Sequence, residues 1–287
     1  MKIISDVNRL RDCTRAWRKQ DEKIGFVPTM GNLHAGHLRL VERAQTISDR
    51  VVASIFVNPL QFGPNEDFQN YPRTFDEDAE KLRRLGVDLL FAPTVEVMYP
   101  AGTKAATTVS VPDISDVLCG AHRPGHFSGV ATVVARLFNM VEPDLAVFGE
   151  KDFQQLTIIR RMVEELAFPV EVIGEPTVRE ADGLAMSSRN QYLTAEERGK
   201  ATLIYRLLKE TADSIKCGNT DFRALERAGL ERLAQTGFKP DYFEIRREQD
   251  LQPAENKADS VIVFIAAWLG KARLIDNLRV SDTDSSA

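Results

Sequence analysis

Two of the four histidines of the chain, His34 and His37, lie three residues apart in the segment PTMGNLHAGH (28–37). Residues with this spacing share one face of a helix, and the first N–H groups of a helix have no partner within it. A helix N-terminus also attracts phosphate, and Gly31 and Gly36 let a ligand approach the backbone closely. The segment therefore predicts a phosphate site in which imidazoles donate to phosphate oxygens.

Two other interpretations of the histidines are weaker. An ordinary pair beside a turn would not explain why half of the chain's histidines fall in one HxGH pattern at a predicted strand-to-helix turn. A zinc site needs three or four ligands, and no cysteine or third histidine lies nearby in the sequence.

Neutral amides follow a second apolar run, in the segment VNPLQF (57–62). Asn58 and Gln61 can hydrogen-bond a small polar substrate. The Asn-Pro pair is also a common turn opener, so this segment alone favours a turn.

Basic side chains occur in two more segments that precede or open a helix. In FGEKDFQQ (148–155), Lys151 can reach phosphate as a point charge, and Gln155 lies one turn further on the same face. In MSSRN (186–190), the hydroxyls and the guanidinium of Arg189 suit phosphate oxygens. A solvated charge cluster and a polar interdomain loop are the respective alternatives.

Two features carry less information. The loop RPGHFSG (123–129) is interpreted as either a pocket wall or a plain connector. Four acids on a predicted helix over 74–85 are interpreted as a solvated face, with Asp78 as the one that could see a bound ion: Asp76, Glu77, Asp78 and Glu80.

The elements that position these segments alternate between strand and helix. Strands are predicted over 24–28, 51–57, 87–91, 145–148 and 170–173, and helices over 33–48, 74–85, 128–141 and 151–167. This alternation predicts an α/β fold, a Rossmann-like doubly wound parallel sheet. Ligands of such sheets bind beyond the carboxyl ends of the strands, where the polar segments fall.

The pattern changes after about residue 176. Long amphipathic helices are predicted over 194–217 and 221–236, and short strands that look antiparallel over 242–246, 260–266 and 272–275. We therefore expect a domain of residues 1–176 and a smaller α+β C-terminal domain of residues 177–287.

Composition excludes several classes of protein. The 287 residues carry a net charge of −5 and are 43% hydrophobic, which argues against a disordered chain and a general nucleic-acid binder. The longest apolar run, 261–269, is too short for a membrane span, and the N-terminus lacks a secretory core. Three cysteines without CxxC spacing indicate reduced thiols in a cytoplasmic protein.

Taken together, the motifs PTMGNLHAGH, SIFVNPLQF, YPRT, RPGHFSGV, FGEKDFQQL and DGLAMSSRN are similar to those of a known family. The chain resembles the pantothenate synthetases (pantoate–β-alanine ligases) of the HxGH nucleotidyltransferase group. The resemblance runs from about 24 to 190 and includes AAWLGKARLIDN (266–277). It implies that pantoate and ATP form pantoyl-adenylate and pyrophosphate, and that β-alanine then yields pantothenate and AMP. It also implies Mg²⁺ with the ATP and a cytoplasmic homodimer with a C-terminal lid.

The resemblance also implies roles for individual residues. His34, His37 and Lys151 would be catalytic, with His37 the assigned acid. ATP would contact Met30, Gly31, Asn32, Leu33, His34, Ala35, Gly36, His37, Gly149, Glu150, Lys151, Asp152, Val178, Met186, Ser187, Ser188 and Arg189. Pantoate would contact Gln61 and Gln155, and β-alanine would contact Gln61 and Asn58. No metal ligand is implied.

The sequence departs from the family pattern at two places, and two other functions remain as alternatives. Ala35 occupies a position that is often acidic in the family, and MSSRN lacks the lysine of the KMSKS loop of class I aminoacyl-tRNA synthetases, so Arg189 would carry that charge. An adenylyl- or cytidylyltransferase would leave the nucleotide on its product. A nucleotide-binding module without activity would release no pyrophosphate.

Overall fold

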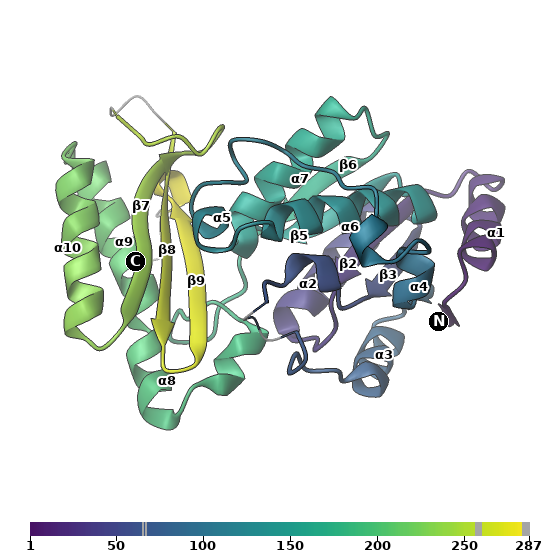
Figure 1. Ribbon diagram of the computed structural model, residues 1–287, viewed down its shortest axis with the longest axis horizontal. Helices are drawn as coiled ribbons and strands as arrows, with labels where there is room; N and C mark the ends of the chain where they lie inside the picture. Colours follow the sequence, from purple (N-terminus) through teal and green to yellow (C-terminus); the bar gives the residue numbers. More distant parts are fainter. Residues whose placement is uncertain (65, 67, 256–259, 283–287) are drawn as a thin grey trace. The chain divides into compact units, whose positions relative to one another are not determined.

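The computed structural model describes residues 1–64, 66, 68–255 and 260–282. The chain divides into two compact units, each described by itself (Figure 1). The first unit comprises Met1–Asp116, Arg123–Glu150 and Gln155–Pro176. The second comprises Val117–His122, Lys151–Gln154 and Thr177–Ala287.

The first unit is built on a six-stranded sheet of order β1-β4-β3-β2-β5-β6, in which every neighbouring pair is parallel. Its strands are β1 (Lys2–Ile4), β2 (Ile24–Thr29), β3 (Arg50–Ile55), β4 (Leu89–Phe91), β5 (Leu145–Gly149) and β6 (Glu171–Glu175). The connections contain α1 (Val7–Arg18), α2 (Ala35–Ile47), η1 (Pro59–Gln61), α3 (Phe75–Arg84), α4 (Val95–Met98), η2 (Thr103–Ala105), α5 (Cys119–His122), α6 (His126–Val141), η3 (Glu150–Asp152) and α7 (Phe153–Glu165).

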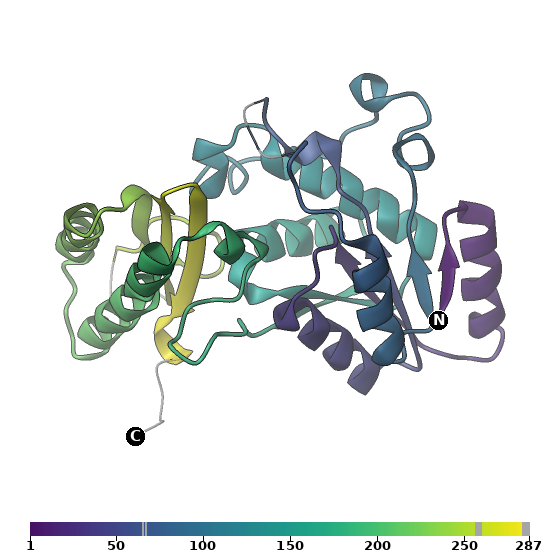
Figure 2. The same ribbon diagram turned by 90° about the horizontal axis from the view of Figure 1, so that it is seen from below.

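Apolar side chains cover both faces of this sheet, as a doubly wound fold requires. Val27 belongs to a buried cluster with Leu40 of α2 and Leu82 of α3. The adjacent Phe26 points to the opposite face, where its ring lies 6.4 Å from that of Phe138 in α6. Figure 2 shows α2 and α3 on one side of the sheet and α6 on the other.

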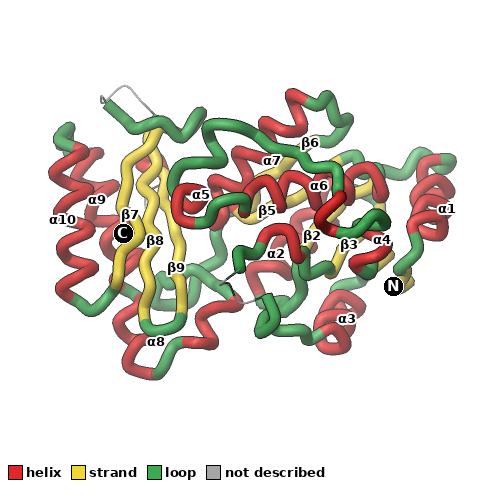
Figure 3. Tube along the Cα trace, viewed as in Figure 1, coloured by secondary structure: helices red, strands yellow, loops and turns green. Residues whose placement is uncertain are grey.

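The second unit contains the three-stranded antiparallel sheet β7-β8-β9 (Figure 3). Its elements are η4 (Ser188–Tyr192), α8 (Ala195–Ala201), α9 (Leu203–Lys216), α10 (Phe222–Gln235), β7 (Lys239–Arg247), β8 (Val261–Leu269), β9 (Ala272–Arg279) and η5 (Val280–Asp282). One face of the sheet and the apolar faces of α9 and α10 form a single core that includes Leu207, Leu233 and Ile265.

The predicted fold class, a Rossmann-like parallel sheet with a smaller α+β part, is confirmed. The helix predicted over 194–217 is instead two helices, which are separated at Thr202. The Thr202 hydroxyl donates to the carbonyl of Gly199, a local bond of the kind that competes with continuous helix. The structure also adds β1 and α1, which the sequence analysis left unassigned. No helix of the described residues is long and apolar enough to cross a membrane.

Candidate active site

The HxGH segment connects β2 to α2 through a turn with two successive left-handed residues, Gly31 (φ 83°) and Asn32 (φ 51°). His34 then caps α2, because its Nδ1 accepts a hydrogen bond from the backbone N–H of Gly36 (3.1 Å). Nδ1 of His37 accepts from the backbone N–H of His34 (3.3 Å). The centroids of the two rings lie 4.1 Å apart, and the ring planes are tilted by 42°.

These bonds select one form of each imidazole. An Nδ1 atom that accepts a hydrogen bond carries no proton, so the ring proton of His34 and of His37 lies on Nε2. Each ring thus caps the helix through Nδ1 and carries its proton on Nε2. This is the arrangement that donation to an anionic oxygen at a helix N-terminus needs.

Asp78 of α3 holds this turn. Its carboxylate is fully buried and accepts hydrogen bonds from the backbone N–H groups of Asn32 (2.7 Å) and Leu33 (2.8 Å). Lys81 donates to the carbonyl of Leu33 (2.9 Å). The predicted solvated face is therefore wrong for Asp78, although Asp76 is exposed. The reason is that the partners of Asp78 lie 45 and 46 residues earlier in the sequence.

The amide of Gln61 joins the segment after β3 to the HxGH segment. Its oxygen accepts from Asn58 Nδ2 (3.2 Å), and its nitrogen lies 3.0 Å from the sulfur of Met30. Asn58 is only 1% exposed. Asn58 Nδ2 also donates to the carbonyl of Gly129 (3.0 Å), and the Tyr99 hydroxyl donates to Asn58 Oδ1 (2.7 Å). Residues that follow the carboxyl ends of β2 and β3 thus meet, together with Tyr99 at the end of α4 and Gly129 of α6.

Gly129 permits α6 to approach η1 closely, because a Cβ atom at Gly129 would lie 2.3 Å from the carbonyl oxygen of Leu60 and 2.7 Å from the backbone nitrogen of Gln61. We expect Gly129→Ala to lower the free energy of unfolding by about 1–3 kcal/mol, the usual cost of overpacking. Denaturant unfolding would measure it. The control is Gly199→Ala in α8, where no described atom lies within 4 Å of the added methyl group. A Gly129→Ala protein as stable as wild type would contradict the close approach.

The loop RPGHFSG also supports Gln61. Nδ1 of His126 lies 2.8 Å from the backbone oxygen of Gln61, and Nε2 of His126 lies 3.0 Å from Arg123 Nη1. Arg123 makes a two-pronged ion pair with Glu66. Burial alone would raise the pKa of the Glu66 carboxyl, but the hydrogen bonds and charge of Arg123 outweigh burial and lower that pKa. The loop therefore contacts the backbone of Gln61 through His126.

The segment after β5 is divided between the two units. Gly149 and Glu150 belong to the first unit, and Lys151 and Asp152 to the second. The helix predicted from Lys151 begins at Phe153, because residues 150–152 form the short helix η3. The Lys151 ammonium lies 3.9 Å from Asp152 Oδ2, and the Lys151 carbonyl accepts from Asn277 Nδ2 of β9 (2.9 Å). Asn277 therefore anchors the backbone at Lys151.

The predicted ATP residues near 178–189 lie together within the second unit. The backbone N–H of Met186 donates to the carbonyl of Val178 (3.0 Å). Ser187 caps η4 by accepting from the N–H of Arg189 (3.2 Å). Ser188 lies in η4 between them.

Gln155 lies in the first unit, at the start of α7, and is half-buried. The contacts described above bring together the HxGH turn, Asn58 and Gln61. The sequence analysis missed Tyr99 and the true environment of Asp78. Neither has a local signal, since each acts on residues more than 40 positions away.

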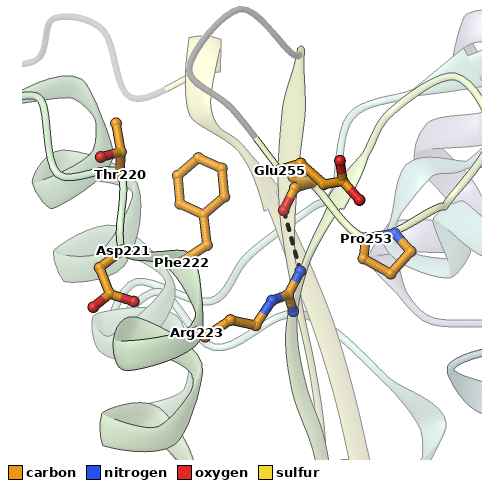
Figure 4. Close-up of a pocket in the computed structure, with 7 residues that line it drawn as sticks. Thr220, Asp221, Phe222, Arg223, Pro253 and Glu255 are labelled. Atoms are coloured by element: carbon orange, nitrogen blue, oxygen red, sulfur yellow. Dashed lines mark hydrogen bonds between the residues drawn. The ribbon is translucent and has the colours of Figure 1, made fainter.

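A separate pocket of about 450 Å³ lies in the second unit, between the start of α10 and residues 253–255 (Figure 4). Arg223 crosses it and donates to the carbonyl of Ala254 (3.1 Å). None of its lining residues is a predicted site residue.

A family model described as pantoate-beta-alanine ligase matches residues 2–279. The chain belongs to the pantoate–β-alanine ligase family. The resemblance predicted from the motifs is therefore confirmed, and it extends well beyond the segment 24–190 in which the motifs concentrate.

Individual relatives agree with this assignment. A pantothenate synthetase of Pseudomonas putida (strain W619) is 55% identical over 287 residues, which cover 100% of both chains. The crystal structure of pantothenate synthetase from Thermus thermophilus has 50% identity and a TM-score of 0.90, with 98% of this chain and 99% of that one covered. A pantoate-beta-alanine ligase from Francisella tularensis, 36% identical with a TM-score of 0.83 and 99% and 100% coverage, was solved in complex with beta-gamma ATP and beta-alanine.

The described residues do not form a ligand cluster for the Mg²⁺ that the family resemblance implies. Among the described residues, no group of three or more His, Cys, Asp or Glu side chains could hold a metal ion. Asp78, the one acid expected to see an ion, is engaged with backbone N–H groups. Mg²⁺ in nucleotide enzymes is held largely by phosphates and water, so we assign it no ligand in this protein.

Proposed function

We propose that this protein condenses pantoate with β-alanine in an ATP-dependent reaction, through a pantoyl-adenylate. The observation that carries the proposal is the contact of the Gln61 amide with Met30, which puts a neutral amide beside the HxGH turn. A helix N-terminus with two imidazole donors suits a triphosphate, and an adjacent amide suits a small organic acid. Membership of the family supports the same reaction.

The reaction needs positioning and charge stabilisation from the protein. In the first step a carboxylate oxygen of pantoate bonds to the α-phosphorus of ATP, and the bond from that phosphorus to the β-phosphate bridge breaks to release pyrophosphate. In the second step the amine of β-alanine bonds to the acyl carbon and loses a proton. The acyl C–O bond then breaks, and AMP leaves with that oxygen. Donors aimed at the oxygens where charge develops are the main source of rate in such transfers.

We assign the residues of the first unit as follows. The turn Met30–His37 binds the phosphates of ATP, with Nε2–H of His34 and of His37 as donors, and Gly149 and Glu150 border the nucleotide. Gln61 and Gln155 orient pantoate, because neutral amides hold a carboxylate without quenching its charge as an arginine would. Gln61 also serves β-alanine. Asn58 contributes to β-alanine binding through Gln61, because both polar atoms of the Asn58 side chain already have partners within the protein.

The residues of the second unit complete the proposal. Lys151 supplies positive charge to the phosphates, Asp152 lies on the ribose side, and Val178 lies near the adenine. Met186, Ser187, Ser188 and Arg189 close over the triphosphate. Residues 1–176 then act as the nucleotide- and pantoate-binding domain, and residues 177–287 as a lid that protects the adenylate from water. We further propose that ATP brings Mg²⁺ and that the protein is a cytoplasmic homodimer.

Gln155→Leu is expected to raise the KM for pantoate about tenfold while changing the KM for ATP less than about twofold, because the change removes one half-buried hydrogen-bonding group from the proposed pantoate site. Steady-state kinetics with each substrate varied in turn would measure both. Gln20→Leu, at an exposed position in the turn after α1, is the control. Equal effects on the two substrates would remove Gln155 from the pantoate site.

The reaction is tested by pyrophosphate exchange. Labelled pyrophosphate should enter ATP when the protein is given Mg²⁺ and pantoate without β-alanine, and adding β-alanine should yield AMP and pantothenate by mass spectrometry. Exchange that requires the amine would overturn the two-step order. A product that keeps its nucleotide would identify a nucleotidyltransferase instead, and ATP binding without pyrophosphate release would identify a binding module.

A further inference from the structure

Tyr99 is not one of the residues assigned in the proposed function, but it contacts Asn58, which in turn contacts Gln61 of the proposed pantoate site. It ends α4, the short helix that follows β4, and is only 2% exposed. Its ring lies 6.2 Å from that of Phe56, and the guanidinium of Arg136 lies over it at 5.6 Å. A tyrosine buried this deeply keeps a hydrogen-bond partner for its hydroxyl. Here the partner is Asn58 Oδ1, at 2.7 Å.

The hydrogen-bond partners of Asn58 fix the orientation of its side-chain amide. Oδ1 accepts from the Tyr99 hydroxyl and from the backbone N–H of Leu60 (3.2 Å). Nδ2 donates to the carbonyl of Gly129 (3.0 Å), so its second hydrogen is directed to Gln61 Oε1 (3.2 Å). A flipped amide would set its NH₂ against the N–H of Leu60 and its oxygen against the carbonyl of Gly129, which is unfavourable in a buried site. In the orientation that remains, Oδ1 faces the Tyr99 hydroxyl, which donates to it.

The orientation of the Asn58 amide in turn fixes that of the Gln61 amide, because Asn58 Nδ2 donates to Gln61 Oε1. Because Gln61 Oε1 faces Asn58 and accepts from it, the Gln61 NH₂ points the other way, where it faces the sulfur of Met30 and can be offered to a ligand. A thioether is a weak acceptor, so a carboxylate or hydroxyl oxygen would take these N–H groups in its place.

We infer that Tyr99 is a positioning residue, which acts through Asn58 to hold the Gln61 amide with its N–H groups toward the organic acid. The inference rests on the proposed function. Burial raises the pKa of Tyr99 to about 12, so its hydroxyl keeps its proton, and remains a donor, throughout the ordinary assay range.

Tyr99→Phe tests this inference, because it removes the hydroxyl and keeps the ring. We expect the KM for pantoate to rise about fivefold to tenfold, the order of one buried hydrogen bond, while the KM for ATP stays within about twofold. Tyr205→Phe is the matched control, since Tyr205 packs on the core of the second unit. A Tyr99→Phe protein with wild-type kinetics for pantoate, or with equal changes for both substrates, would overturn the inference.

A double-mutant cycle separates positioning from simple loss of stability. In a Gln61→Ala background, Tyr99→Phe should change the KM for pantoate no further, because the group that it positions is gone. Additive effects would show that Tyr99 acts by another route.

A measurement without substrate keeps the inference testable by itself. The side-chain NH₂ resonances of Asn58 and Gln61, followed by ¹H–¹⁵N NMR, should shift in Tyr99→Phe and not in Tyr205→Phe. Unchanged resonances would contradict the relay. If the wild-type protein were inactive but the Asn58 and Gln61 resonances still shifted in Tyr99→Phe, the proposed function would be overturned, whereas the hydrogen-bonded connection from Tyr99 to Gln61 would stand.

Discussion

His37→Ala is expected to slow the formation of pantoyl-adenylate at least about a hundredfold, and Lys151→Ala by a similar factor. Removing one donor from a site where charge develops commonly costs about 3 kcal/mol. His37 is the stronger case, because its Nδ1 bond to the backbone N–H of His34 leaves Nε2–H as the donor. Rapid-quench measurement of adenylate or pyrophosphate from ATP and pantoate would give the rate directly.

Two further variants separate catalysis from helix capping. In His37→Asn a short amide can replace Nδ1 as acceptor for the backbone N–H, so the stability of the protein should hold while the rate still falls. His122→Ala, which removes a histidine of the second unit, should leave the rate near that of wild type. Turnover near wild type in both His37→Ala and Lys151→Ala would count against the assigned roles.

Asp78→Ala is expected to lower the free energy of unfolding by about 2–6 kcal/mol, because it leaves the buried N–H groups of Asn32 and Leu33 without their acceptor, at about 1–3 kcal/mol each. The turn that precedes His34 would also lose its support, so the KM for ATP should rise. Denaturant unfolding and steady-state kinetics would measure the two effects.

The structure offers a matched control for Asp78. Asp76 lies two residues earlier on the same helix and is exposed, so Asp76→Ala should change both quantities little. Asp78→Asn should fall between wild type and Asp78→Ala, because an amide has one oxygen and would turn its NH₂ toward one of the two donors. If Asp78→Ala were as mild as Asp76→Ala, the clamp on the HxGH turn would be wrong.

The parts of the fold that could be predicted are those with a local physical signal. The run VVASIFV predicts a strand covered on both faces, and β3 is found there. The strand β1 has three residues at the edge of the sheet, too few for a periodicity. The helix α1 buries only Leu10 and Thr14, so a mostly polar surface hides its pattern.

In the candidate site, too, the residues with a local signal in the sequence could be predicted and the others could not. The strand-to-helix turn that carries His34 and His37, and the turn that carries Asn58 and Gln61, could be predicted from residue types at strand ends. Asp78 could not, because acidic neighbours suggested a solvated face and its partners are distant in sequence. Tyr99 likewise has no motif, and only the packing of the strand ends shows that it contacts Asn58.

Transfer of an isotopic label most directly tests the claim that a triphosphate and an organic acid meet at this edge of the sheet. Pantoate labelled with ¹⁸O in its carboxylate is incubated with the protein, ATP, Mg²⁺ and β-alanine, and the AMP is analysed by mass spectrometry. The mechanism predicts one ¹⁸O atom in each AMP formed, since the oxygen that attacks the α-phosphorus stays on it. AMP without the label would contradict an acyl-adenylate and the site built to form it.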